Sequence, residues 1–333
     1  MMELSQDQDH PRSRPAAASP TPASPGSATR RLRLGTRASA LARWQADWVA
    51  SELTKLGITI EMIHISTQGD VSSRPLGTIG GQGVFTKELQ RALLDDAIDL
   101  AVHSLKDLPT ERVPGLRLAA VPERESTRDA LICRAADSFE ALPPGARIGT
   151  GSIRRRAQLL HARPDLEILE IRGNVDTRLR KLDEEQYDAI VLAEAGLRRL
   201  GLAQRITQIL SPELMLSAVG QGALGIEARE GDAPALEILA RLDDAPTHAA
   251  VLAERTLLSA LRAGCLAPVG AWARVADGRL QLDAVVLSHD GRHRISVSRA
   301  GPWEEAESLG AQAAADLLGQ GAEQLIVASR HPA

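Results

Sequence analysis

Short apolar runs alternate with helical segments in two successive rounds, and this alternation limits the fold more than any other sequence feature. The first round has expected strands at about 32–37, 58–66, 99–104 and 116–121. The second round has expected strands at 129–133, 146–150, 166–171 and 188–196, with helices at about 152–162 and 174–183. Strands that alternate with helices favour parallel sheets covered by helices. We therefore expect two α/β units.

The pattern changes after Asp244. A predicted helix at 247–263 precedes three strands at about 271–276, 279–287 and 293–299, and Asp-Gly pairs supply turns between these strands. A helix at 304–318 and a last strand at 324–328 follow. This order predicts a small α+β unit with an antiparallel sheet.

Three domains after a disordered extension are the expected organisation. Residues 1–30 are rich in Pro, Ala and Ser and lack apolar periodicity, so they cannot bury enough surface to offset their ordering entropy. The glycine-rich stretch AVGQGALG at 218–225 indicates a crossing between units. The expected domains are 31–123 completed by a return segment at 222–241, then 127–216, then 245–333.

Composition narrows the class of protein. The net charge of -4 argues against a general nucleic-acid binder, which usually carries a basic excess. The two cysteines, Cys133 and Cys265, form no disulfide framework or zinc motif. The sequence has no apolar run long enough to cross a membrane and no apolar secretory region. We expect a cytoplasmic monomer.

Two loops that follow predicted strands carry candidate binding residues. In GTRASALA, Arg37 lies in the turn and Ser39 opens the helix, which makes a site for a carboxylate or phosphate. The alternative is an ordinary N-cap beside a solvated arginine. In HSLKDLP, Lys106 and Asp107 follow a buried strand, where α/β proteins bind ligands. The alternative there is a solvated turn pair.

An arginine series follows the loop GTGS at 149–152. Thr150 offers a hydroxyl, Ser152 can cap the helix, and an arginine fork fits a carboxylate. Adjacent arginines cannot share one helix face, so only some of the first three point inward. The series comprises Arg154, Arg155, Arg156, Arg172, Arg178, Arg198 and Arg199. It predicts a polyanionic ligand, against the alternatives of a basic outer face and a phosphate-backbone site.

Cys265 lies in AGCLAP, a loop bounded by glycine and proline. Most lone cysteines are buried apolar residues, but a loop cysteine is more exposed and more reactive. Cys133 lies inside an apolar strand and is expected to be structural.

Taken in order, these groups resemble the porphobilinogen deaminase family from about residue 32 onward. No single match is decisive, but so many in one linear order are specific. The matching segments are GTRASALA, TQGD (67–70), GGQGVFTKEL (80–89), AVHSLKDLPT (101–110), GTGSIRRRAQL (149–159), RGNVDTRL (172–179), YDAIVLAEAGLRRLG (187–201), AVGQGALGIE (218–227) and AGCLAPVGA (263–271).

The resemblance implies a hydroxymethylbilane synthase that condenses four porphobilinogen molecules on a dipyrromethane cofactor attached through Cys265. It implies a catalytic role for Asp107, which stabilises positive charge as ammonia leaves. Its implied cofactor contacts are Ser104, Lys106, Thr150, Ser152, Arg154, Arg155, Arg172, Gly173 and Arg178. Its implied substrate contacts are Arg37, Ser39, Phe85, Arg199 and Gln221. No metal or nucleic acid is implied.

The resemblance also implies two periplasmic-binding-protein-like α/β domains that move about a hinge. The sequence departs from the family in its active-site loop, where Thr78 and Gln82 replace lysines. The competing hypothesis is a non-catalytic anion-binding protein of the same two-lobed architecture. Cys265 and Asp107 discriminate between the two, because a mere binder needs neither.

Overall fold

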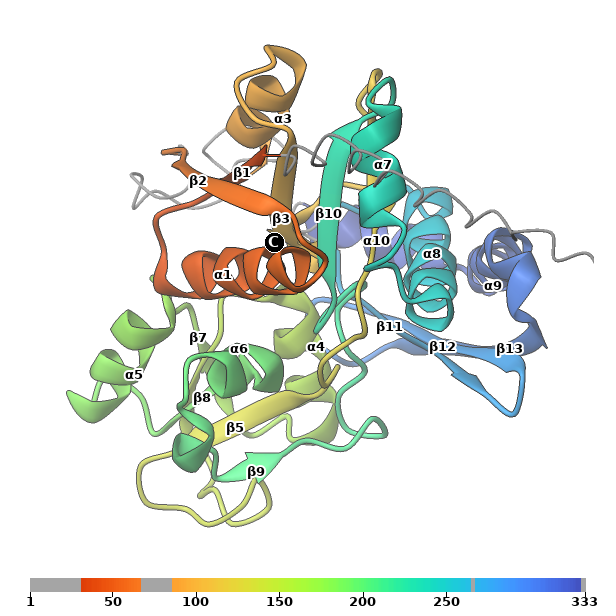
Figure 1. Cartoon of the computed structure of the whole chain (residues 1–333). Coiled ribbons are helices and arrows are strands. Elements are labelled where there is room, and N and C mark those ends of the chain that lie inside the picture. The colour runs from red at the N-terminus through yellow and green to blue at the C-terminus, as the bar shows by residue number, and fades with distance from the viewer. Residues whose placement is uncertain (1–30, 67–85, 265–266, 331–333) are drawn as a thin grey trace, which may run out of the picture.

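Three β-sheets organise the chain (Figure 1). The computed structural model describes residues 31–66, 86–264 and 267–330. Two sheets have five strands each and form two lobes, and the third has three strands and lies to one side of them. The predicted class, two α/β units and a small α+β unit, is confirmed.

The first lobe contains a sheet with strand order β2-β1-β3-β10-β4. Its strands are β1 (Arg31–Thr36), β2 (Thr59–His64), β3 (Leu100–Ser104), β4 (Leu116–Ala120) and β10 (Leu224–Arg229). Its helices are α1 (Ala40–Lys55), α3 (Lys87–Leu94), the 3₁₀ turn η1 (Leu105–Asp107) and α7 (Ala233–Leu239). β1 pairs in parallel with β2 and β3, whereas β10 runs antiparallel to β3 and β4. The segment that returns from the second lobe thus supplies an interior strand.

The second lobe repeats this arrangement with strand order β7-β6-β8-β5-β9. Its strands are β5 (Asp129–Cys133), β6 (Arg147–Gly149), β7 (Glu167–Leu169), β8 (Ala189–Ala193) and β9 (Gln208–Ile209). Its helices are α4 (Ile153–Ala162), α5 (Val175–Asp183), α6 (Glu194–Arg199) and the 3₁₀ turn η2 (Ala203–Arg205). β5 is antiparallel to both neighbours. The strand predicted at 188–196 stops at Ala193, because Glu194 begins α6.

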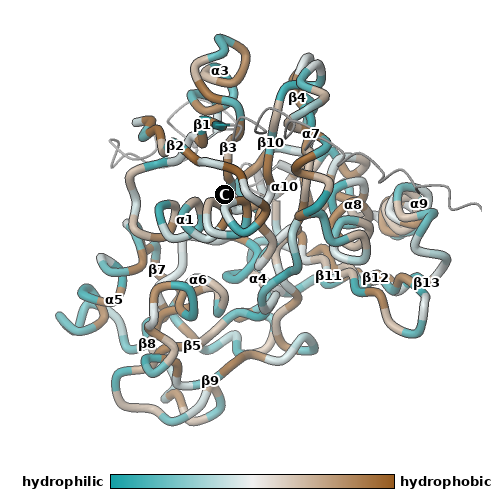
Figure 2. Tube along the Cα trace, viewed as in Figure 1, coloured by the Kyte–Doolittle hydropathy of each residue, from teal (hydrophilic) through white to brown (hydrophobic). Residues whose placement is uncertain are grey.

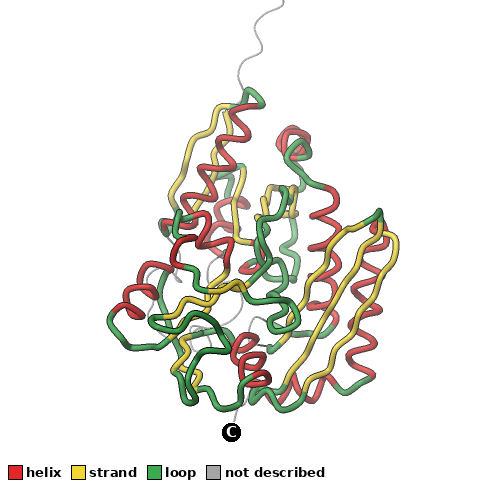
Figure 3. Tube along the Cα trace, turned by 90° about the horizontal axis from the view of Figure 1, so that it is seen from below, coloured by secondary structure: helices red, strands yellow, loops and turns green. Residues whose placement is uncertain are grey.

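The third unit is an antiparallel sheet of β11 (Val269–Ala276), β12 (Arg279–Leu287) and β13 (Arg294–Pro302). Helices lie along one face of this sheet, as Figure 3 shows from below. They are α8 (Ala245–Ala260), the 3₁₀ turn η3 (Trp303–Glu305), α9 (Ala306–Gly319) and α10 (Ala322–Arg330). The strand predicted at 324–328 is wrong, because this segment belongs to α10.

Two segments cross between the lobes, the outward one between β4 and β5 and the return one between β9 and β10, and α8 contacts both of them. Glu254 of α8 is fully buried and its carboxylate pairs with Arg124, which precedes β5. The same carboxylate accepts hydrogen bonds from the backbone N–H groups of Gly220 at 2.7 Å and Ala273 at 2.8 Å. A buried charge requires such pairing. Glu254 therefore ties the outward and return crossings to the third unit.

Apolar residues follow the strands inside each unit, and the outer helix α5 is largely polar (Figure 2). Fully buried side chains such as Leu34, Leu131 and Leu282 form the centres of three separate cores. Within the described ranges, no helix is long and apolar enough to span a membrane.

Candidate functional site

Three polar loops follow the carboxyl ends of β1, β3 and β6. Ser39 caps α1 by accepting a hydrogen bond from the backbone N–H of Ala42 at 3.3 Å. Ser152 caps α4 in the same way from Arg155 at 3.4 Å. Both predicted helix starts are confirmed, and Arg37 is half-buried just before the first. A helix start presents N–H groups and a positive dipole end, which favour an anion.

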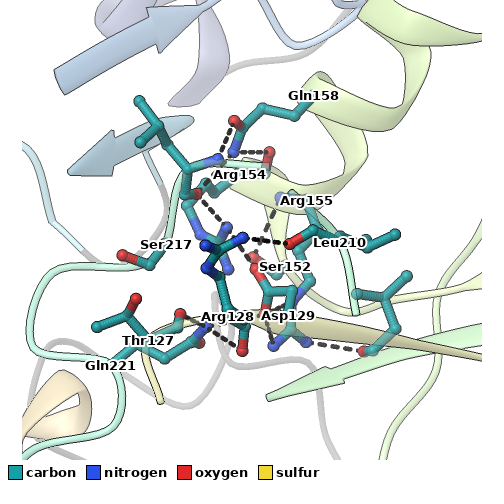
Figure 4. Close-up of polar contacts among 12 residues, drawn as sticks. Thr127, Arg128, Asp129, Ser152, Arg154, Arg155, Gln158, Leu210, Ser217 and Gln221 are labelled. Atoms are coloured by element: carbon teal, nitrogen blue, oxygen red, sulfur yellow. Dashed lines mark hydrogen bonds and ion pairs between the residues drawn. The ribbon is translucent and has the colours of Figure 1, made fainter. Parts of the chain in front are cut away.

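A buried carboxylate organises the first turn of α4 (Figure 4). Asp129, at the start of β5, is 0% exposed, and its Oδ2 lies 2.8 Å from Nη1 of Arg154. Its Oδ1 accepts hydrogen bonds from Nε of Arg155 at 3.0 Å and from Nη2 at 2.7 Å. Arg154 and Arg155 are both buried, because both pair with the carboxylate of Asp129.

The charges in this cluster are strongly coupled. Burial favours the neutral form of Asp129, but the positive charges and hydrogen bonds of Arg154 and Arg155 outweigh burial and hold its pKa far below the usual range. Burial lowers the pKa of Arg154. Among the described residues, Nε of Arg154 is a buried donor without a hydrogen-bond partner. Such a donor is costly to leave unmatched, so it fits an acceptor on a bound anion.

The turn η1 brings Lys106 and Asp107 to the same place from the first lobe. Burial lowers the pKa of Lys106 to about 8, and Asp107 opposes this shift while Arg155 adds to it. Burial, together with the positive charges of Arg155 and Arg172, lowers the pKa of Arg178 to about 10, and Asp107 again opposes the shift. Lys106 of the first lobe therefore interacts electrostatically with Arg155 of the second lobe, and Asp107 and Arg155 interact in the same way with Arg178.

Hydrogen bonds hold three other predicted residues in place. Ser104 accepts a bond from the side-chain amide of Gln45 at 2.8 Å, and Thr150 accepts one from the backbone N–H of Ser152 at 3.2 Å. Gln221 is buried and donates to Oδ1 of Asp129 at 2.9 Å. Its Oε1 is an unpartnered buried acceptor within the described part of the chain.

Arg172 and Gly173 lie in the loop between β7 and α5. Arg172 pairs with Glu170, and the carbonyl of Gly173 accepts a hydrogen bond from Nε of Arg178 at 2.8 Å. Gly173 has a φ of +112°, and a Cβ there would lie 2.6 Å from Thr177. Glycine is therefore required for this loop to turn toward Arg178.

Arg199 belongs to a separate contact between the lobes. Its Nη2 donates to the carbonyl of Gly222 at 2.7 Å, and its guanidinium lies 5.7 Å from the ring centre of Trp44 on α1. Burial lowers its pKa. Its described contacts are thus with Gly222, in the return segment between the lobes, and with Trp44 on α1.

Four residues singled out from the sequence lie outside the described residues: Thr78, Gln82, Phe85 and Cys265. Gly264, which precedes Cys265 in the sequence, lines a small cavity together with Lys106 and Leu108. Cys133 is half-buried in the second lobe, and burial raises its pKa to about 11. An unreactive thiol of this kind agrees with the predicted structural role.

Sequence reasoning missed Asp129. The available signal was an acidic residue at the head of the otherwise apolar strand DALIC. A carboxylate in that position needs a buried cation, and the arginines of α4 supply it.

The fold and the site together define a two-lobed α/β protein in which cationic side chains from both lobes interact with two acidic residues, Asp107 and Asp129. Residues 32–237 match the family described as porphobilinogen deaminase, dipyromethane cofactor binding domain, and residues 248–319 match its C-terminal domain. The chain belongs to the porphobilinogen deaminase family.

Named relatives agree with this assignment. The porphobilinogen deaminase of Syntrophotalea carbinolica is 51% identical over 300 residues, which cover 89% of this chain and 95% of the relative. That of Desulforudis audaxviator is 51% identical over 304 residues, covering 90% of this chain and 98% of the relative. Among solved structures, the methionine binding protein MetQ covers 64% of this chain and 89% of its own, with 15% identity and a TM-score of 0.42.

Proposed function

We propose that the protein joins four porphobilinogen molecules head to tail and releases hydroxymethylbilane. Each addition frees one ammonia molecule, and one water molecule releases the finished chain. Membership of the porphobilinogen deaminase family carries this proposal. The cationic cluster supports it, because every pyrrole unit brings an acetate and a propionate, and arginine binds carboxylates well.

A dipyrromethane cofactor, attached by a thioether at Cys265, is proposed to occupy the cluster. When bound, it supplies the free pyrrole α-carbon to which the first substrate is joined. Nε of Arg154, which has no hydrogen-bond partner among the described residues, fits one of its carboxylates. The residues proposed to hold it are Ser104, Lys106, Thr150, Ser152, Arg154, Arg155, Arg172, Gly173 and Arg178.

Asp107 is proposed as the catalytic residue. Loss of ammonia from porphobilinogen leaves a cationic methylene-pyrrolenine, and a carboxylate next to it stabilises the developing charge. Asp107 is half-buried and faces the positive charges of Lys106 and Arg178.

The remaining predicted residues are proposed to bind the incoming substrate. Arg37 and Ser39 lie at the start of α1, where a helix favours an anion. Arg199 has further N–H groups beyond the one that it gives to Gly222. Oε1 of Gln221 has no partner in the part of the chain that the structure describes, so it can accept a hydrogen bond from a ligand N–H group. Phe85 is proposed to contact a pyrrole ring.

Intact mass and ammonia release test the proposal together. The purified protein should exceed its sequence mass by two pyrrole units and should release four ammonia molecules per bilane. A Cys265→Ser variant should lose the added mass and the activity. The competing hypothesis, a non-catalytic anion-binding protein, predicts carboxylate binding without added mass or ammonia. A Cys265→Ser protein with both properties intact would overturn the thioether.

We also propose a cytoplasmic monomer with three domains, at 31–123 with 222–241, at 127–216 and at 245–333. The two segments that connect the lobes, both bound by Glu254, are the proposed place of the hinge. Light scattering after size-exclusion chromatography should give the mass of one chain, and a dimer mass would contradict the monomer.

A further inference from the structure

Arg255 of α8 holds the chain just after Asp107. Its Nη1 donates to the carbonyl of Leu108 at 2.9 Å, and its Nη2 donates to the carbonyl of Pro109 at 2.7 Å. The two carbonyls are consecutive, and the guanidinium fork binds both at once. A side chain of the third unit thus fixes a loop of the first lobe.

The loop needs an outside partner because of its sequence. Leu108 is extended, with φ -82° and ψ 118°, as expected for a residue before proline. Pro109 has no N–H group, so the chain leaves η1 without continuing a helical ladder. Buried carbonyls require a donor. Arg255 supplies two donors, and burial lowers its pKa while Glu227 opposes that shift.

The same arginine also lies close to the chain that leads into Cys265. Arg255, Pro109, Lys106 and Gly264 line one cavity. Gly264 follows α8 by only a few residues and immediately precedes Cys265. Arg255 therefore binds the loop that follows Asp107 and lines the same cavity as the residue that precedes the proposed attachment point.

We propose that Arg255 is a positioning residue that sets Asp107 relative to the pyrrole chain anchored in the third unit; this inference rests on the proposed function. It touches backbone carbonyls and not the reacting atoms. A misplacement of about 1 Å in an active site can cost about 100-fold in rate. Loosening the Leu108–Pro109 loop should therefore reduce turnover more than substrate binding.

The test compares the holoenzyme with Arg255→Gln and Arg255→Lys, with Arg299→Gln as the control. Arg299 also lies in the third unit but forms an exposed ion pair with Asp316. For each protein, kcat and KM for porphobilinogen, the added mass and the thermal midpoint are measured. We expect Arg255→Gln to keep the added mass, to change KM by less than about threefold and to lower kcat by about 10- to 100-fold.

Arg255→Lys keeps the positive charge but lacks the planar fork that reaches both carbonyls, so its kcat should fall between those of Arg255→Gln and the parent. The control should match the parent. An unchanged kcat in Arg255→Gln overturns the inference, as does a loss of activity in proportion to lost added mass. If Arg255→Gln does not fold, Arg255→Lys decides, and parental kcat in that variant overturns it. An inactive parent enzyme would instead contradict the proposed function itself.

Discussion

Replacing Asp129 with asparagine removes the single negative charge that two buried arginines share. The change keeps the shape of the side chain, but it leaves Arg154 and Arg155 facing a neutral amide. Arg154 and Arg155 are only 4% and 6% exposed, so water cannot replace the lost charge. Breaking a buried ion pair by removing one partner costs about 3–5 kcal/mol. We expect a loss of that size in the free energy of unfolding of the second lobe.

Urea denaturation followed by circular dichroism measures this loss at pH 7. Asp165→Asn is the matched control, because Asp165 pairs with Arg163 on the surface of the same lobe. An exposed pair contributes about 0–1 kcal/mol. Equal losses in Asp129→Asn and the control would refute the reasoning.

The pH dependence of stability gives an independent check. The folded protein lowers the pKa of Asp129, so this carboxyl binds fewer protons when folded than when unfolded. Its contribution is therefore complete above the ordinary aspartate pKa of about 3.9 and declines as the pH falls below it. The parent should lose stability in acid more steeply than Asp129→Asn, and parallel pH curves would contradict this explanation.

Three further results are expected. Asp107→Asn should lower kcat by about 100- to 1000-fold with a much smaller change in KM, because it removes charge stabilisation from the transition state; equal changes in both would argue against a catalytic role. In the parent, kcat/KM should fall as the pH rises through about 8, where Lys106 loses its charge, and Lys106→Arg should remove that inflection. Gly291→Ala should destabilise the protein by about 1–3 kcal/mol, because a Cβ would lie 2.6 Å from the carbonyl oxygen of Ala157. Gly278→Ala, at a similar positive φ with open space around it, is the control for thermal unfolding, and equal shifts would exclude the clash.

The helix caps and the positions of the loops that follow strands could be predicted from the sequence. Ser39 and Ser152 stand immediately before helices, and capping depends on residues within one turn. The loops after β1, β3 and β6 were placed correctly because their strands are short, apolar and bounded by turn residues. The carboxyl ends of parallel strands share one edge, and so the sequence could predict where Lys106 and Asp107 lie.

Contacts between distant segments could not be predicted. Asp129 and Arg155 lie 26 positions apart, and Arg255 and Leu108 lie 147 apart. No local pattern pairs such residues, because the pairing depends on how the sheets and the third unit pack. The sequence alone therefore does not distinguish Arg255 from any other arginine on a helix.

The error at 324–328 has a specific physical cause. Gln-Leu-Ile-Val-Ala is rich in residues that favour strands, but the segment obeys a helical period. Ala322, Ile326 and Ser329 are buried at spacings of four and three, whereas Val327 is 50% exposed. That spacing marks one face of a helix packed on the third sheet.

The position of β10 also determines the order in which the lobes can be finished during synthesis. β10 lies between β3 and β4, so the first lobe lacks an interior strand until the ribosome has passed Arg229. The last strand of the second lobe ends at Ile209 and emerges earlier. Domains generally fold as units as they emerge. In this chain, therefore, the lobe that begins first is completed second. Until β10 is made, β3 and β4 lack the strand that joins them, while the second lobe can already complete its sheet.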